Sequence, residues 1–502
     1  MRKWPQRLAG LLAAAVFAVL ASARAETCQL ALKRLEPMSR TQMFMGSQPE
    51  DVLFRMTNPQ HLFMQFGVGM VTDMTKAFPK VVKKEPEKYE SERPFRGVAK
   101  LGSQQFGFVL DAQPAKAESE SSKSDAKESK PEGYGRLLFD YNHNGDLTDD
   151  KVVEANPPPQ GILSMGMPAG YSHREFPRID VSIEVDGAKT DYSFFLTVVS
   201  QSSGGFSYAT AMFNAAAYRE GQITLGGKSR RVVLLDNNSN GRFDDKFGVF
   251  RSDSGGDLSP VPGDVLLIDP QTGKQANPLL QMALGMDGDE NRHHVSKLVN
   301  VDGRFHELKV SATGDQLTLT PSSVPLGKLA NNNKGFRAVL FSDDQGFVKL
   351  TGGQSEPVSV PAGEWNLLSY TIDRTGYEPA EKPEKERSLL ETLTDALMGG
   401  ASAANAMPRY TFVSARATGE CKPVTVRQGK TTAMPFGPPY KPVVKVAFVQ
   451  GDGQVQLALS LVGAAGEVCS GLQVDGKQPP PPEFTITGPD GKEVESGKFE
   501  YG

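Results

Sequence analysis

The sequence of 502 residues contains little of what most chemical sites are built from. It has three cysteines, two tryptophans and six histidines. The cysteines and histidines do not occur in the closely spaced pairs that bind zinc. Gly-x-Ser-x-Gly and the phosphate-binding glycine loops are also absent. These absences predict no catalytic activity, although the many acidic residues leave open an unrecognised carboxylate pair of the glycosidase type.

The chain also has no excess of positive charge and no long apolar run beyond its start. Its 55 basic and 59 acidic residues give a net charge of −4. A nucleic-acid-binding protein needs a basic face, so we predict no nucleic acid partner. After the N-terminus, no stretch reaches the roughly 20 apolar residues of a membrane-spanning helix, so we predict no transmembrane segment in the mature chain.

The N-terminus has the pattern of a secretory signal peptide. Three basic residues precede an apolar run at 8–21, and the small-x-small sequence at 23–25 matches a cleavage site. We expect residues 1–25 to be removed and the mature protein to be secreted, periplasmic or part of the cell envelope. In an oxidising compartment, Cys421 and Cys469 are predicted to form a disulfide that leaves Cys28 over, and three free thiols are the alternative.

Most of the mature chain has the pattern of β-strands. Apolar and polar residues alternate over 179–185, and Asp186-Gly187 begins a turn, which predicts a hairpin over 178–200. A second hairpin is predicted over 303–321, and a short helix over 70–84. The fold class is therefore predicted to be mainly β, with antiparallel sheets or β-sandwiches in several domains and a few short helices near the N-terminus.

Two long insertions interrupt the β pattern, and both are predicted to be disordered. Residues 114–133 offer too few apolar side chains to offset the entropy of ordering, whereas residues 378–408 consist largely of flexible polar and Ala/Gly tracts. Within the second, leucines at 389, 390, 393 and 397 share one helical face. That face fits either a partner-binding amphipathic helix or a loosely docked loop helix.

The composition predicts three regions after the signal. Residues 26–325 form a β-rich region in which 95–112 resembles 218–237, as expected of a duplicated hairpin unit. Residues 326–438 contain "VPAGEW", which resembles the closing hairpin of prealbumin-like and carboxypeptidase-regulatory-like sandwiches. Residues 439–502 alternate like a small immunoglobulin-like domain.

Two loops rich in Asn and Asp carry the most specific chemical signal. The first loop, 140–150, and the second loop, 236–245, both place Asp at position 1, Asn at positions 3 and 5, Gly at position 6 and acids near position 10. Ca²⁺ prefers six to eight oxygen ligands, and alternating positions of a tight loop direct oxygens inward. Position 7 can offer its backbone carbonyl. The candidate ligands are Asp140, Asn142, Asn144, Asp146, Asp149, Asp150, Asp236, Asn238, Asn240, Arg242, Asp244 and Asp245.

Plain turns are the alternative, because Asn, Asp and Gly are common in turns without any metal. Neither loop has the closing Glu of an EF-hand, and each follows a strand pattern. Four acids downstream of the second loop, at 253, 257, 264 and 269, offer further ligands that the sequence cannot assign.

The order Asp-x-Asn-x-Asn-Gly resembles the calcium loops of FG-GAP propellers and thrombospondin-type repeats. The phrases "LLFDYNHNGDLTDD", "VVLLDNNSNGRFDD", "GDVLLID", "VPAGEW" and "FEYG" are similar to those of uncharacterised secreted proteins of planctomycete-type bacteria. This resemblance implies an exported β-rich architecture and no known activity.

Together these patterns predict an exported, calcium-stabilised structural or binding protein of the cell envelope. Its partner is expected to be an envelope protein or a polysaccharide. The alternative is a secreted hydrolase, glycosidase- or peptidase-like, which predicts a pocket where two acids, or an acid and a His, converge with shifted pKa values.

Overall fold

The structure is a computed structural model, and its description covers part of the chain. The described residues are 24–36, 57–66, 73–113, 133–157, 170–203, 206–251, 258–270, 291–333, 335–352, 356–374, 411–448 and 455–501. The predicted signal peptide up to residue 23, nearly all of the insertion at 114–133 and the whole of that at 378–408 lie outside them.

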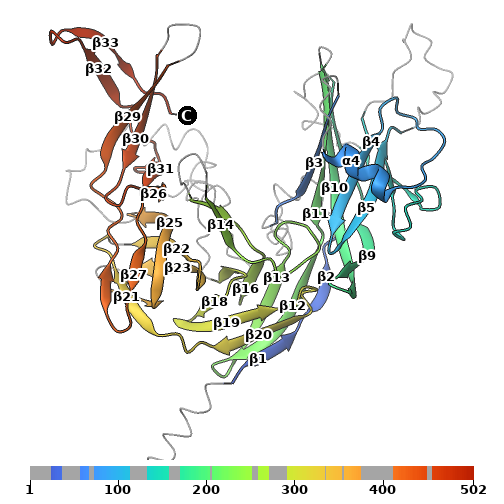
Figure 1. The fold of residues 1–502 in the computed structure, drawn as a ribbon, viewed down its shortest axis with the longest axis horizontal. Coiled ribbons are helices and arrows are strands. Elements are labelled where there is room, and N and C mark those ends of the chain that lie inside the picture. The colour runs from blue at the N-terminus through green and yellow to red at the C-terminus, as the bar shows by residue number, and fades with distance from the viewer. Residues whose placement is uncertain are drawn as a thin grey trace, which may run out of the picture.

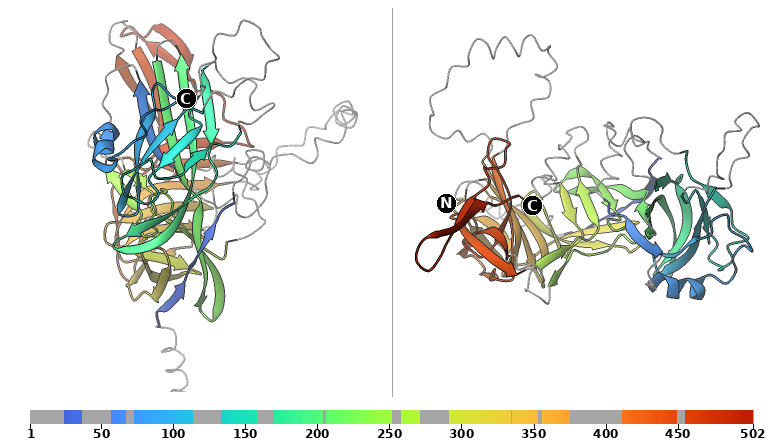
Figure 2. Two further views of the ribbon diagram at one scale, coloured as in Figure 1. Left: turned by 90° about the vertical axis from the view of Figure 1, so that its right-hand side faces the viewer. Right: turned by 90° about the horizontal axis from the view of Figure 1, so that it is seen from above.

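The described residues form a mainly β protein with antiparallel sheets and one short helix, which confirms the predicted fold class. Figure 1 shows two arms that rise from a common base, and Figure 2 shows the same arrangement from the side and from above. Among the described residues, no helix is both long and apolar enough to cross a membrane.

Two sheets build the N-terminal arm. One has the order β4-β5-β6-β7, and the other has the order β3-β11-β10-β8 with β9 paired to β10. Their bounds are β3 Gln60–Phe66, β4 Phe95–Leu101, β5 Gln104–Asp111, β6 Arg136–Phe139, β7 Val152–Glu154, β8 Tyr171–Glu175, β9 Ile179–Val185, β10 Ala188–Ser203 and β11 Phe206–Ala215. The hairpin predicted over 178–200 is confirmed: β9 pairs with β10, and every second residue of β9 is buried.

Helix α4 (Asp73–Val81) lies against β4 and β5 and is the helix predicted over 70–84. Phe78 and the following Val82 pack into a small core with Val109 and Leu138. This contact fixes the segment after α4 beside the sheet and brings it to the first loop.

Two further sheets form the base. Their orders are β17-β16-β13-β12-β2 and β1-β20-β19-β18, and the pair β14-β15 stands beside them. The bounds are β1 Glu26–Gln29, β2 Ala31–Arg34, β12 Ala217–Leu225, β13 Lys228–Leu235, β14 Gly248–Arg251, β15 Leu258–Val261, β16 Val265–Ile268, β17 Arg292–His294, β18 Leu298–Val301, β19 Arg304–Val310 and β20 Gln316–Pro321. The hairpin predicted over 303–321 is confirmed by the pairing of β19 with β20.

The other arm contains a three-stranded sheet, an eight-stranded sheet and a terminal hairpin. The orders are β24-β21-β28, β23-β22-β25-β26-β31-β30-β29 with β27 on β25, and β32-β33. The bounds are β21 Leu326–Ala330, β22 Phe336–Ser342, β23 Gly346–Gly352, β24 Val358–Pro361, β25 Gly363–Asp373, β26 Phe412–Arg416, β27 Val424–Val426, β28 Thr431–Ala433, β29 Lys441–Phe448, β30 Val455–Val462, β31 Val468–Gln473, β32 Glu483–Thr487 and β33 Glu493–Lys498.

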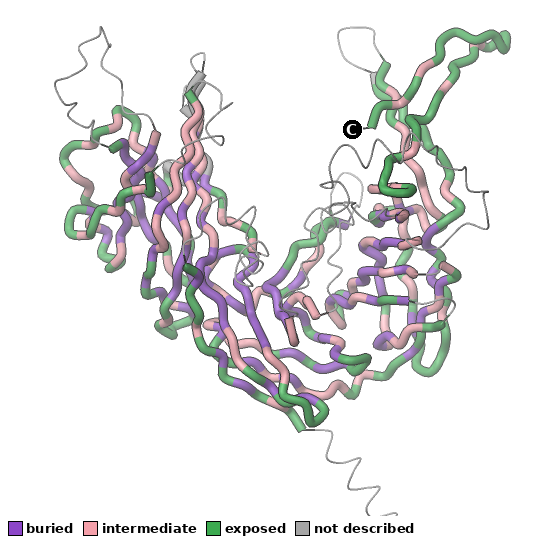
Figure 3. Tube along the Cα trace, turned by 180° about the vertical axis from the view of Figure 1, so that it is seen from behind, coloured by how far each residue is buried: buried purple, intermediate pink, exposed green. Residues whose placement is uncertain are grey.

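The last 60 residues differ from the predicted small immunoglobulin-like domain. Strands β29 to β31 continue the eight-stranded sheet of the preceding region, and β32-β33 is a separate hairpin. Val444, Val446 and Val494 are exposed, so the alternating residues do not enclose a core of their own. Figure 3 shows the exposed residues gathered along these terminal strands.

The base packs against the second arm, the one formed by β21 to β33, through apolar contacts. Leu298 and Phe305, on β18 and β19, belong to the core of the second arm around Trp365. Phe247 and Leu258 pack with Phe347 in a smaller cluster. The predicted boundary at 325/326 falls between β20 and β21, but the surfaces on either side of it are packed together.

Candidate functional site

Both predicted loops follow buried strands and adopt the same backbone turn. The first loop follows β6 and the second follows β13. Position 4 has positive φ in each, 58° at His143 and 58° at Ser239. Position 6 does as well, with 82° at Gly145 and 81° at Gly241, a region that glycine enters without steric cost. The shared sequence frame therefore encodes a shared local structure.

The carboxylate at position 1 lies inside each turn. Asp140 accepts the backbone N–H groups of Asn144 (3.0 Å) and Gly145 (2.9 Å). Asp236 accepts those of Asn240 (3.2 Å) and Gly241 (2.7 Å). Both aspartates are almost fully buried. Position 1 thus closes the turn by binding the donors at positions 5 and 6.

The side chains at positions 3, 5 and 10 converge in the first loop. Asp149 accepts the side-chain amides of Asn142, at 3.4 Å, and of Asn144, at 2.8 Å. The amide oxygen of each Asn accepts a backbone N–H two residues later, as in an Asx turn. The plain-turn alternative is thus compatible with the same geometry.

The second loop repeats this convergence. Asp245 accepts the side-chain amides of Asn238, at 2.9 Å, and of Asn240, at 2.6 Å. The oxygen of Asn240 accepts the N–H of Arg242 at 2.8 Å. Each loop thus gathers one carboxylate and two amides, and a second carboxylate lies inside the same turn at position 1. Carboxylate and amide oxygens are the ligand types that Ca²⁺ takes.

The other predicted side chains point elsewhere. Asp146 accepts the Lys84 ammonium (2.8 Å), and Asp150 accepts the N–H of Tyr141 (3.2 Å). Arg242 binds both oxygens of Asp186 and also pairs with Asp244. The side chains at position 7 are therefore engaged in ion pairs, and a ligand from this position would be the backbone carbonyl of Asp146 or Arg242.

These contacts shift the acid strength of the carboxyl groups. The hydrogen bonds from Lys84 and Thr148 lower the pKa of Asp146 to about 2. Burial, followed by repulsion from Asp149, raises the pKa of Asp150 to about 6. Burial also raises the pKa of Asp236 to about 6, although Tyr192 and two backbone N–H groups oppose the change.

Asp264 is the functional residue that the sequence did not single out. Its carboxylate accepts the backbone N–H groups of Asn237 (2.9 Å) and Asp245 (2.8 Å), so it spans the second loop. Burial and then repulsion from Asp236 hold its pKa well above the usual range. Of the other downstream acids, Asp269 binds Arg230, while positions 253 and 257 lie outside the described residues. The only sequence signal for Asp264 is its place directly before an apolar strand.

The second loop is a meeting point of three sheets. Asn240 accepts the N–H of Gly102 (2.6 Å) in the β4–β5 turn, and Ser239 accepts that of Ala215 (2.9 Å) at the end of β11. Tyr192 of β10 donates its hydroxyl to Asp236 at 2.7 Å. The first loop instead contacts the segment after α4, where the backbone N–H groups of Lys83 and Lys84 donate to the carbonyl of Gly145, and strand β5, where the ring of His143 donates to the carbonyl of Gln105.

The structure offers no site built from acids, cysteines and histidines alone. Among the described residues there is no group of three or more His, Cys, Asp or Glu side chains that could hold a metal ion. A cation site in either loop therefore depends on the asparagine side chains and on backbone oxygens. The duplicated hairpins β4–β5 and β12–β13 are both present, but the first loop follows the third strand of its sheet and the second loop follows the hairpin directly.

The cysteines differ from the prediction. Cys421 and Cys469 are both free, and so is the buried Cys28. Cys469 lies on β31 opposite Ala415, where its thiol donates to the carbonyl of Gly471, whereas Cys421 lies beyond the end of β26 in the turn closed by Thr418. Burial raises the pKa of each of these two thiols.

The comparisons with known proteins give no family for this chain: no family model, no curated protein and no solved structure matches it.

Proposed function

We propose that this protein is an exported structural or binding protein of the cell envelope whose two loops bind Ca²⁺ as structural clamps. The observation that carries the proposal is the convergence of the side chains at positions 3, 5 and 10 in both loops, with the carboxylate of position 1 inside the same turn. Two copies of one frame gather two Asp and two Asn side chains each. A cation in this position replaces the internal amide contacts with amide oxygens that face the ion.

The expected affinity is low. Asn in place of Asp reduces the negative charge of the ligand set, which places each site among weak extracellular sites with a Kd of roughly 10⁻⁴–10⁻³ M. At about 1 mM Ca²⁺ each occupied loop then adds about 0.4–1.4 kcal/mol to the free energy of unfolding. The role that fits this magnitude is a clamp that is occupied outside the cell, and not a sensor.

The large described cavity of the base contains His306, whose pKa is lowered by burial, together with Glu26 and Asp302. Among the described residues, no hydrogen bond or ion pair joins the His306 ring to either acid, so the hydrolase alternative gains little from this cavity. The acids with raised pKa values are Asp150, Asp236 and Asp264, and none of them lines the large described cavity of the base. Two of the three are held by backbone N–H groups on both carboxylate oxygens. Such groups are positioned to shape a loop, and the proposed role remains structural or binding.

The test is thermal melting of the mature protein with Ca²⁺, with Mg²⁺ and with a chelator. We expect Ca²⁺ to raise the melting temperature by about 1–3 °C in total. Asp149→Asn removes the charge at position 10 of the exposed first loop and should lose about half of the rise. Asp343→Asn, an exposed acid outside both loops, is the matched control. If the melting temperature is the same in chelator and at two Ca²⁺ concentrations that differ tenfold, the proposal is wrong.

A further inference from the structure

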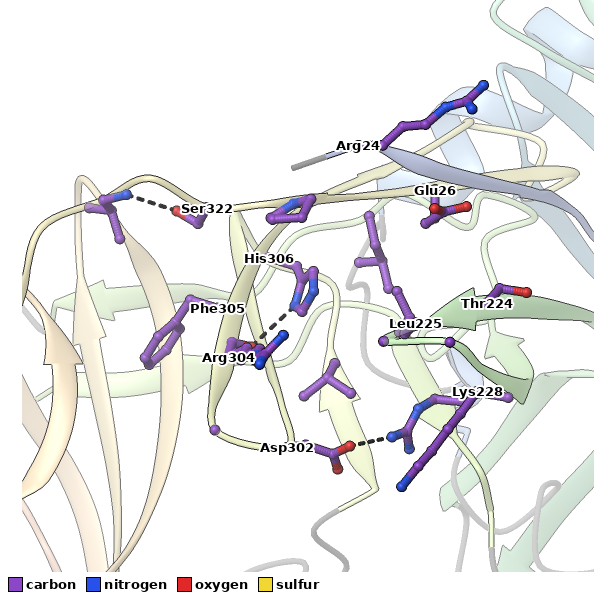
Figure 4. Close-up of a pocket in the computed structure, with 18 of the residues that line it drawn as sticks. Arg24, Glu26, Thr224, Leu225, Lys228, Asp302, Arg304, Phe305, His306 and Ser322 are labelled. Carbon is purple, nitrogen blue, oxygen red and sulfur yellow. Dashed lines mark hydrogen bonds and ion pairs between the residues drawn. The ribbon is translucent and has the colours of Figure 1, made fainter. Parts of the chain in front are cut away.

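A large cavity lies in the base, where the two arms meet. It has a volume of about 860 Å³ and is bordered by the β12–β13 turn, the β18–β19 turn, the start of β1 and the segment that leads from β20 to β21. Ligand-binding cavities usually have volumes of about 300–1,000 Å³. Figure 4 shows side chains from all four segments around this space.

The two hairpin tips are alike in structure and in chemistry. Both have two central residues with positive φ, Gly226-Gly227 (58° and 78°) and Asp302-Gly303 (50° and 78°), as type I′ turns require. At each tip an apolar residue faces a cation across the strands: Leu225 opposite Lys228, and Val301 opposite Arg304. A Cβ built on any of the three turn glycines meets nothing within 4 Å, so the tips border open space.

An ion pair fixes the two tips relative to each other. Arg230 of β13 binds Asp302 in the β18–β19 turn and also binds Asp269 at 2.8 Å. Lys228 and Arg304 are different, because within the described part of the chain neither has a carboxylate partner. The edge of the cavity therefore carries two cations that have no carboxylate within ion-pair distance among the described residues, and the carboxylate of Glu26 lines the same cavity.

His306 adds a hydrogen-bond acceptor to this wall. Its Nδ1 lies 3.1 Å from the backbone carbonyl of Arg304 and donates to it. Burial lowers the pKa of His306, so the ring is neutral near pH 7 and Nε2 keeps its lone pair. Figure 4 places the ring inside the cavity, above Arg304. The floor beneath is apolar and includes the buried Leu319.

We propose that this cavity binds the end of a peptide whose last residue is apolar and whose α-carboxylate is free. Lys228 and Arg304 bind the carboxylate, Nε2 of His306 accepts a peptide N–H, and the apolar side chain covers the floor near Leu225 and Val301. The end of a peptide chain has a carboxylate for the two cations, a peptide N–H for the acceptor and a side chain for the apolar surface. Arg24 also lines the cavity but precedes the predicted cleavage site, and the proposal assigns it no contact. The proposal rests on the proposed binding role but not on the calcium loops.

A polysaccharide with uronate groups shares the carboxylate but lacks the apolar side chain. The cavity offers it little to stack on, because the ring of Phe305 belongs to the buried core of the second arm. The peptide is therefore the occupant that the lining favours, and the uronate is an outcome that the experiment separates.

The experiment measures binding of an N-acetylated Ala-Ala-Leu-Leu peptide to the full mature chain by calorimetry, in chelator. The same peptide with a C-terminal amide removes only the charge, and we expect it to bind at least about tenfold more weakly. Equal binding of acid and amide, or no binding of either, overturns the proposal. Because chelator is present throughout, failure of the calcium proposal leaves this result unaffected.

Variants then locate the site. Lys228→Gln and Arg304→Gln should each weaken binding of the acid about tenfold and leave binding of the amide unchanged. Lys309→Gln, an exposed lysine of the same strand β19 that does not line the cavity, should have no effect. Two results contradict the proposal. In one, Lys309→Gln weakens binding as much as the other two variants do. In the other, the peptide fails to bind, and tri-galacturonate binds in a way that depends on Lys228 and Arg304. All three positions are exposed, so folding should be retained, and the melting temperature checks this.

Discussion

The first and second loops share one frame, one turn and one pattern of side-chain convergence, yet they lie in different surroundings. In the first, Asn144 and Asp149 are exposed, and the loop contacts the segment after α4 and strand β5 of its own sheet. In the second, Ser239 and Gly241 are buried, and the loop forms hydrogen bonds with two other sheets, at the β4–β5 turn and at β10 and β11. The comparison teaches that a ten-residue sequence frame fixes the local turn, while the rest of the chain decides what the turn supports.

The largest expected difference follows from removing position 1. Asp236→Ala leaves the Tyr192 hydroxyl and two backbone N–H groups without an acceptor. Each buried unsatisfied donor costs about 1–3 kcal/mol, so the free energy of unfolding should fall by about 3–5 kcal/mol. Asp140→Ala leaves two backbone N–H groups without an acceptor, so the free energy of unfolding should fall by about half as much. Urea unfolding measures both, and Asp236→Asn, which keeps one oxygen, is the milder variant if Asp236→Ala does not fold. Equal losses in the two loops would show that the second is not the more important support.

A difference in pH dependence comes next. The pKa of Asp236 is raised to about 6 by burial, against about 3.9 in an unfolded chain, and that of Asp264 is raised further. The folded state therefore binds more protons than the unfolded state above about pH 4. In chelator, the free energy of unfolding should fall as the pH rises from about 4 through 6. Asp264→Asn, measured by urea unfolding across this range, should flatten the fall, because it removes one of the two carboxyl groups whose pKa is raised. An unchanged pH profile in the variant contradicts the assigned origin.

The smallest expected difference concerns position 7. Arg242 binds Asp186 through two hydrogen bonds, whereas its counterpart Asp146 receives one from the exposed Lys84. Arg242→Gln should cost about 1 kcal/mol and Lys84→Gln less than about 0.5 kcal/mol, because exposed single ion pairs contribute little. Both losses should shrink in 1 M salt, where charges are screened. A larger loss of unfolding free energy for Lys84→Gln than for Arg242→Gln would show that the ion pair of the first loop contributes more to stability than that of the second, which contradicts the prediction.

The sequence predicted what depends on local pattern. The alternation in 179–185 defined strand β9, and the Asp-Asn-Asn-Gly order predicted the turn in both loops, because neighbouring residues alone determine these features. It did not predict Asp264, which reaches Asp245 from 19 residues further along the chain. Nor did it predict that β29 to β31 extend an existing sheet, since alternation identifies a strand without identifying its partner. The sequence also did not predict that Cys421 and Cys469 are free, because positions along the chain do not show whether two thiols lie close together in the fold.

The central claim is that both loops bind Ca²⁺, and direct binding by calorimetry tests it most closely. The account predicts two sites per mature chain with a Kd of roughly 10⁻⁴–10⁻³ M. One site should remain in Asp149→Asn and one in Asp245→Asn. A chain that takes up no Ca²⁺ at millimolar concentration, or that keeps both sites in these variants, contradicts the account and reduces both loops to Asx turns.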